Sequence, residues 1–93
     1  LKRSLAQVYV IPIGKVDASP VVDELRKAGI NTDVDLMGRG LSKNIKYADA
    51  YGIPYVLFVG EDELKAGKFK LKNLGSGEEK VGKIEDLLEG LPL

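Results

Sequence analysis

The sequence predicts an α/β fold of three layers (α/β/α), in which helices cover both faces of a mixed five-stranded sheet. Strand-like apolar runs alternate with stretches of helical spacing over residues 7–59, and this order favours parallel strands joined by right-handed crossovers. Tyr55–Val59 is apolar at every position, as expected of a central strand covered on both faces. Phe69 and Leu71 alternate with lysines ahead of a glycine-rich turn, which indicates a C-terminal β-hairpin that extends the sheet.

The first half of the chain is expected to form a strand, a helix and a second strand. Residues 7–13 are mostly β-branched and aromatic, which favours a strand. Ser19 can cap the following helix, Pro20 suits its first position and Gly29 can end it. The apolar stripe of this helix lies at Val21, Leu25 and Ala28. The second strand is expected over Asn31–Leu36.

The second half adds two more helices and two more strands around the central strand. The loop Gly38–Gly40 precedes a helix that Gly52 and Pro54 end. The apolar stripe of this helix lies at Leu41, Ile45 and Ala48. A short turn is expected over Asp62–Ala66, and a hairpin strand around Glu79–Val81. The final helix has its apolar stripe at Ile84, Leu87, Leu88 and Leu91.

The composition excludes several kinds of site. The 93 residues suffice for one core, so residues 1–93 are expected to form a single domain. The chain does not begin with methionine, which fits a fragment of a longer protein, the expectation adopted here, and also a processed start. The absence of cysteine and histidine excludes disulfides, the usual zinc sites, Ser-His-Asp triads and Cys-His dyads. The 14 basic and 14 acidic side chains balance, so net charge does not indicate a nucleic-acid partner. No apolar run approaches the roughly 20 residues that span a membrane.

The candidate site lies at the carboxyl ends of the parallel strands, where open α/β sheets bind ligands. We expect three loops to meet there, over residues 12–19, 36–40 and 60–63. The front of the second helix adds Lys43, Asn44, Lys46 and Tyr47, and Arg39 precedes it. Lys43, Lys46 and Tyr47 are spaced i, i+3, i+4 and share one helix face, which suits phosphates and an unstacked base. The alternative is a solvated helix face on which Tyr47 is a packing residue.

Other charged and glycine-rich segments give weaker signals. Gly38–Lys43 has a lysine where a dinucleotide fingerprint needs its third glycine, and no GxxxxGK[ST] motif occurs. The acids of Glu61–Glu63 suit the start of the short turn Asp62–Ala66, where they offset exposed amides, better than a metal site, because neighbouring carboxylates point in different directions. Lys68, Lys70 and Lys72 project from one side of a strand, where they either protect a sheet edge or form a basic rim for a polyanion.

The ordered motifs of the chain are shared with a known family. In chain order they are Leu25-Arg26, Ala28-Gly29-Ile30, Lys43, Lys46-Tyr47-Ala48-Asp49, Gly52-Ile53-Pro54, Gly60-Glu61-Asp62-Glu63-Leu64, Lys72-Asn73-Leu74 and Gly77-Glu78. From about Val8 onward the chain resembles the C-terminal anticodon-binding domain of class II aminoacyl-tRNA synthetases, most closely the histidyl subgroup. The broader group keeps a glycine and, three residues later, a glutamate, which are Gly60 and Glu63 in this sequence.

The resemblance implies a mixed five-stranded sheet flanked by three helices. It further implies that the domain binds the anticodon stem-loop of the tRNA for histidine. It also implies that aminoacylation is done elsewhere, so no catalytic residue, metal site or cofactor is expected in this domain. The parent protein is expected to be an ATP-dependent histidine–tRNA ligase that uses magnesium. The expected partners are the tRNA, the catalytic domain of the parent chain and a second copy of the parent in a homodimer. The expected location is the cytoplasm, with no membrane contact.

The expected RNA contacts follow from the chemistry of an anticodon loop, whose bases are single-stranded and can be splayed out and stacked. The residues expected to hold phosphates are Arg39, Lys43 and Lys46. Tyr47, or else Tyr51, is expected to stack on a base. Asp35 either accepts a hydrogen bond from a base amino group or caps the next turn.

One departure from the family pattern and two alternatives accompany these expectations. Pro12–Leu25 is about one helical turn shorter than in family members, so no base contact is carried over to Lys15–Ser19. The first alternative is a non-catalytic synthetase-like paralogue domain used for protein interaction or regulation. The second is a flavodoxin-like or receiver-like domain. A receiver needs an aspartate at the end of its central strand, where this chain has Gly60.

Overall fold

The computed structural model describes residues 5–35, 38 and 40–89, and within them the elements follow the predicted order. The elements are β1 (Val8–Pro12), α1 (Ser19–Lys27), β2 (Thr32–Val34), α2 (Leu41–Ala50), β3 (Tyr55–Val59), α3 (Glu61–Ala66), β4 (Phe69–Asn73), β5 (Glu79–Gly82) and α4 (Ile84–Glu89). The segment expected to be a short turn is thus the helix α3, so the described residues hold four helices where the family pattern implies three. Leu36 and Leu91, expected in the second strand and the last helix, lie outside the described residues.

Within the described residues the strands form one mixed sheet in the order β2-β1-β3-β4-β5. β1 pairs in parallel with β2 and β3, and the β4–β5 hairpin continues the sheet antiparallel from β3. The predicted topology is therefore confirmed. One expectation about the edge is wrong: β4, which carries Lys70 and Lys72, lies between β3 and β5, so these lysines do not protect an edge.

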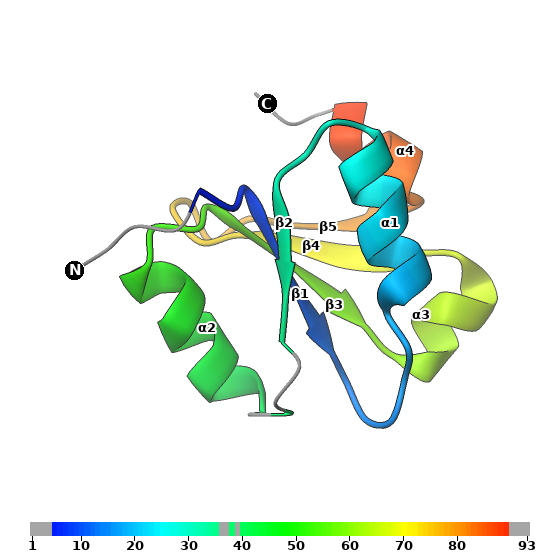
Figure 1. The fold of residues 1–93 in the computed structure, drawn as a ribbon, viewed down its shortest axis with the longest axis horizontal. Helices are drawn as coiled ribbons and strands as arrows, with labels where there is room; N and C mark the ends of the chain where they lie inside the picture. Colours follow the sequence, from blue (N-terminus) through cyan, green and yellow to red (C-terminus); the bar gives the residue numbers. More distant parts are fainter. Residues whose placement is uncertain (1–4, 36–37, 39, 90–93) are drawn as a thin grey trace.

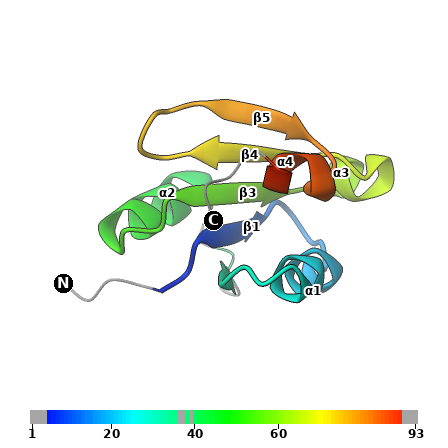
Figure 2. The same cartoon turned by 90° about the horizontal axis from the view of Figure 1, so that it is seen from above.

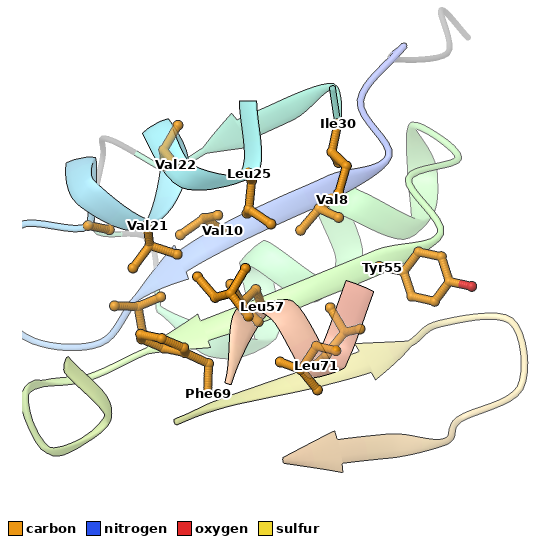
Figure 3. Close-up of a cluster of buried hydrophobic side chains, with 14 residues drawn as sticks. Val8, Val10, Val21, Val22, Leu25, Ile30, Tyr55, Leu57, Phe69 and Leu71 are labelled. Atoms are coloured by element: carbon orange, nitrogen blue, oxygen red, sulfur yellow. The ribbon is translucent and has the colours of Figure 1, made fainter. Parts of the chain in front are cut away.

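Helices cover both faces of the sheet, as predicted, with α1 and α4 on one face and α2 on the other (Figures 1 and 2). On the first face, apolar side chains of α1, β1, β3 and β4 point toward one another (Figure 3). Its centre is Leu57, which is fully buried together with Val8 and Val10 of the neighbouring strand. Burial of each such side chain stabilises the fold by about 1.5–3 kcal/mol.

The second face is smaller and more aromatic. Tyr9, Ile11, Val56 and Phe58 of β1 and β3 pack there with Ala48 of α2. Leu41 does not belong to the buried stripe of α2, contrary to expectation, because its side chain is exposed at the start of the helix. Asn44 is buried on this helix instead, with an exposed fraction of 1%.

The ends of the helices follow the glycines in the sequence. After α1, Gly29 adopts φ +83°, and the amide N–H groups of Gly29 and Ile30 donate to Arg26 O and Leu25 O at 3.0 and 3.1 Å. This is a Schellman motif, and Gly52 ends α2 in the same way. The start of α1 differs from the prediction by one residue, since Ala18 is the N-cap and Ser19 is the first helical residue; no described side chain caps the helix, and Asp17 Oδ1 accepts the Ser19 amide N–H at 3.0 Å.

Candidate nucleic-acid interface

A groove with a volume of about 360 Å³ opens at the carboxyl ends of β1 and β2. Its walls come from the loop that leads to α1, from the outer face of α1 and from Asp35 and Gly38 after β2. Two of the three loops expected to meet at this end of the sheet therefore do so. Gly60 and Glu63 do not line this groove, although the third loop begins beside the first, since the Ile13 amide N–H donates to Val59 O at 2.8 Å.

Three predicted RNA-binding residues lie together on α2. Lys43 and Lys46 are exposed and Tyr47 is half-buried beside them. The ring centroid of Tyr47 lies 5.2 Å from that of Tyr9 and 4.5 Å from that of Tyr51, in both cases with the planes tilted by 35°. Tyr47 therefore packs against the sheet while two flexible cations stand next to it in solvent. Arg39, the remaining predicted phosphate contact, lies outside the described residues.

Asp35 is the predicted site residue that lies deepest in the protein, with an exposed fraction of 4%. Its backbone N–H continues the pairing to β1 by donating to Val10 O at 3.0 Å. Its carboxylate Oδ2 accepts a hydrogen bond from Asn44 Nδ2 at 2.8 Å. The carboxylate thus binds a buried side chain of α2, and among the described residues no side chain caps the start of that helix, so this bond matches neither of the two roles expected for Asp35.

Asn44 and Tyr9 are the residues whose role the sequence did not predict. Besides the bond to Asp35, Asn44 Nδ2 donates to Gly40 O at 3.0 Å, and Asn44 Oδ1 accepts from the Tyr9 hydroxyl at 3.1 Å. Tyr9 is 3% exposed, so its bond to Asn44 is internal, as is the bond from Asn44 to Asp35, whereas the bond to Gly40 O is partly buried. A signal was present: Asn44 falls three residues after Leu41 and four before Ala48, inside the apolar stripe of the helix.

Two further lysines face the same side of the sheet as α2. The register of β3 and β4 places Lys72 beside Val56 and Lys70 beside Phe58, and both partners belong to the cluster under α2. Lys70 Nζ also lies 3.2 Å from Glu79 Oε1, in a largely solvated ion pair. This arrangement joins the predicted basic rim to the face that carries Lys43 and Lys46.

The comparisons with known proteins bear on what this surface does. A model of the family described as "Anticodon binding domain" matches residues 7–92 of the chain. The chain belongs to this family. This anticodon-binding domain is 41% identical over 85 residues to the histidine–tRNA ligase of Pyrococcus furiosus, with 88% of the chain and 20% of the ligase covered. It is 45% identical over 87 residues to the histidine–tRNA ligase of Thermococcus kodakarensis, with the same coverage of 88% and 20%.

Solved structures agree with the family and the fold. The histidyl-tRNA synthetase from Nostoc sp. PCC 7120 matches 92% of the anticodon-binding domain and 21% of its own chain, with a TM-score of 0.82 and 34% identity. The RNA binding domain of a threonyl-tRNA synthetase from Cryptosporidium parvum matches 90% of this chain and 22% of its own chain, with a TM-score of 0.81. Its sequence identity is 22%, so it supports the fold alone. The domain spans about a fifth of the length of the curated histidine–tRNA ligases that it matches.

Two residues that carry the family pattern, Gly60 and Glu63, meet at the start of α3. Gly60 precedes this helix in an extended conformation, and Glu63 folds back over it. A Cβ atom at Gly60 would lie 2.8 Å from Glu63 Oε1, so the glycine makes room for the carboxylate. The three acids also lie in the first turn of α3, as predicted, where they offset the partial positive charge of the helix start.

The described part of the anticodon-binding domain contains neither a cluster of potential metal ligands nor a helix long and apolar enough to cross a membrane.

Proposed function

We propose that the domain binds the anticodon stem-loop of the tRNA for histidine and serves as the recognition domain of a histidine–tRNA ligase. The observation that carries this proposal is the match to histidine–tRNA ligases over 88% of the chain at 41% and 45% identity. The arrangement of cations and aromatic rings on α2 supports it, because unpaired loop bases are recognised by stacking and their phosphates by basic side chains.

The RNA surface in this proposal is centred on α2. Lys43 and Lys46 attract phosphates, as does Arg39 in the preceding loop. Tyr47 offers its remaining free surface to a base, and its contacts with the rings of Tyr9 and Tyr51 hold it in place before the RNA arrives. Such preorganisation lowers the entropy lost on binding.

The surface continues onto β4, where Lys72 and Lys70 follow the same face of the sheet. Lys72 is half-buried and so less mobile than the lysines of α2, whereas Lys70 is already paired with Glu79. We assign Lys72 the larger part in RNA contact, because a fixed cation loses less conformational entropy when it binds a phosphate.

Aminoacylation is assigned to the rest of a longer parent chain, because the domain covers only about a fifth of the histidine–tRNA ligases. The parent is proposed to use ATP and magnesium in its catalytic domain and to act as a homodimer in the cytoplasm. In this proposal the anticodon-binding domain needs no cofactor of its own.

The test is a titration of the domain with the anticodon stem-loop of a histidine tRNA and with stem-loops of other tRNAs, over a range of salt concentrations. We expect tighter binding of the histidine stem-loop. Lys43→Ala and Lys46→Ala should each flatten the slope of log K against log salt by about 0.7. The control is Lys80→Ala, since Lys80 is exposed on β5 next to Leu71 and therefore faces the other side of the sheet. Its slope should match that of the unmodified domain.

Equal binding of all stem-loops would refute the assignment to histidine tRNA, and no binding at all would refute an RNA-binding role. In the second case the alternative, a paralogue domain that contacts proteins, would be favoured. Unchanged salt slopes in both lysine variants would remove α2 from the RNA surface even if the domain binds RNA.

A further inference from the structure

The geometry points to Tyr9, Asn44 and Asp35 as positioning residues that fix the orientation of α2, and through it the orientation of Lys43 and Tyr47 toward the RNA. The effect on RNA binding rests on the proposed function, whereas the positioning of α2 rests on the described contacts. The three residues come from β1, α2 and the end of β2, so their hydrogen bonds tie the helix to two neighbouring strands.

The direction of every bond in this chain is determined. Asn44 faces the carboxylate of Asp35 and the carbonyl of Gly40 with the same end of its side chain, at 2.8 and 3.0 Å. Both partners accept, so that end is the amide nitrogen and both of its N–H groups are used. The other end is the oxygen, to which the Tyr9 hydroxyl donates at 3.1 Å. A rotation of the side chain or of the helix would break several of these bonds at once.

The apolar contacts of α2 are weaker than those of α1. α1 buries Val21, Val22 and Leu25. By contrast, Ala48 is the apolar residue that the described α2 buries fully, and Ile45 and Tyr47 pack against the cluster half-buried. A methyl group fits a flat apolar surface at many rotations of the helix, but a hydrogen bond tolerates little change in distance or angle. A fully satisfied buried polar network can therefore specify one arrangement of the helix.

The start of α2 also depends on Asn44. Gly40 is its N-cap and has no side chain with which to cap the helix. Gly40 O instead accepts both the backbone N–H of Asn44, at 3.2 Å, and its side-chain N–H. Asn44 thus fixes the entry of the helix in addition to its rotation. Lys43 precedes it directly, and Tyr47 follows within one turn.

Tyr9 joins the network to the proposed RNA surface. Its hydroxyl binds Asn44, and its ring lies 5.2 Å from that of Tyr47. The substitution Tyr9→Phe removes the first contact and keeps the second. The matched control is Tyr55→Phe: Tyr55 lies on the adjacent strand and is buried on the opposite face, with its hydroxyl directed away from the core cluster (Figure 3).

The experiment measures two things for Tyr9→Phe and Tyr55→Phe: affinity for the histidine stem-loop, and hydrogen exchange of the amides of residues 41–50 without RNA. For Tyr9→Phe we expect faster exchange in α2, about fivefold weaker binding and poorer discrimination between stem-loops, at an unchanged salt slope because no cation is lost. Tyr55→Phe should leave α2 exchange and affinity unchanged.

A second pair of variants tests the bond between the two side chains. Asn44→Asp places a carboxylate against Asp35 and should weaken binding by more than tenfold through like-charge repulsion. Adding Asp35→Asn restores an amide–carboxylate pair of reversed direction, so the part of the loss that comes from like-charge repulsion should be recovered, whereas the side-chain bond to Gly40 O stays lost in both variants. Failure of the double variant to recover, or unchanged α2 exchange and affinity in Tyr9→Phe, would overturn the inference. If the unmodified domain binds no stem-loop, the proposed function fails, while faster exchange in Tyr9→Phe would still support the positioning of α2.

Discussion

The substitution Tyr47→Leu tests whether a ring that packs inside the domain also serves as a platform for an RNA base. Leucine keeps an apolar side chain on α2 but removes both ring contacts, at 5.2 Å to Tyr9 and 4.5 Å to Tyr51. Aromatic pairs contribute about 0.5–1.5 kcal/mol each beyond the area they bury. The free energy of unfolding should therefore fall by about 1–3 kcal/mol.

The effect on RNA binding has a separate origin and its own magnitude. A base stacked on an aromatic side chain contributes about 1–3 kcal/mol, so the dissociation constant should rise about 5- to 150-fold. The assay is urea unfolding together with binding of a labelled histidine stem-loop, at a temperature where all variants are folded. Tyr47→Phe is the control, because it retains the ring; it should change either quantity by less than about 0.5 kcal/mol.

The two measurements distinguish packing from base recognition. A loss of stability with unchanged affinity would refute base stacking and leave Tyr47 as the packing residue of the alternative interpretation. A loss of affinity with unchanged stability would contradict the ring contacts seen in the structure. Similar affinities for Tyr47→Phe and Tyr47→Leu would also refute stacking.

Two further predictions concern stability. Gly29→Ala should lower the free energy of unfolding by about 1–2 kcal/mol, because Gly29 has φ +83°, although the space around a Cβ atom there is open. Gly82→Ala should raise the free energy of unfolding by up to about 1 kcal/mol, because a Cβ there would make an ordinary 3.8 Å contact with Asp86. Urea midpoints that move in the same direction for both variants would contradict this. The Ser19 hydroxyl and amide hold the pKa of the Asp17 carboxyl below its usual value of 3.8. Ionised Asp17 thus stabilises the fold above that pH, so the urea midpoint of the unmodified domain should exceed that of Asp17→Asn at pH 6, and the gap should narrow as the pH falls below 3.8; a constant gap would contradict this.

The order of elements was predictable because local chemistry determines it. Gly29 and Gly52 end their helices since each adopts the left-handed conformation that the Schellman motif needs. The central position of β3 followed from five consecutive apolar side chains, all of which are buried. Capping was less predictable: Ser19 was expected to cap α1, but the N-cap is Ala18, and the Ser19 amide N–H instead donates to Asp17 Oδ1.

Contacts between distant residues were not predictable from spacing. Lys70 and Lys72 alternate with buried residues in β4, which indicates a wet face but not whether the strand lies at an edge. The hairpin with β5 was predicted, but the pattern does not show which of its two strands pairs with β3, and that pairing decides which strand lies at the edge. The bond between Tyr9 and Asn44 joins residues 35 positions apart, and no local pattern encodes such a pair.

The contrast between the two large helices explains why the site residues were harder to predict than the fold. α1 is fixed by apolar packing, which leaves a periodic signal in the sequence; the pattern predicts buried Val21 and Leu25, although Val22 is buried as well and Ala28 is exposed after the helix. α2 buries an asparagine where periodicity expects an apolar residue, and its exposed flank carries the cations. A helix that presents side chains to a partner must hold one orientation, and directional hydrogen bonds achieve this with little buried area. The weak apolar stripe of α2 is therefore consistent with the proposed RNA surface on this helix.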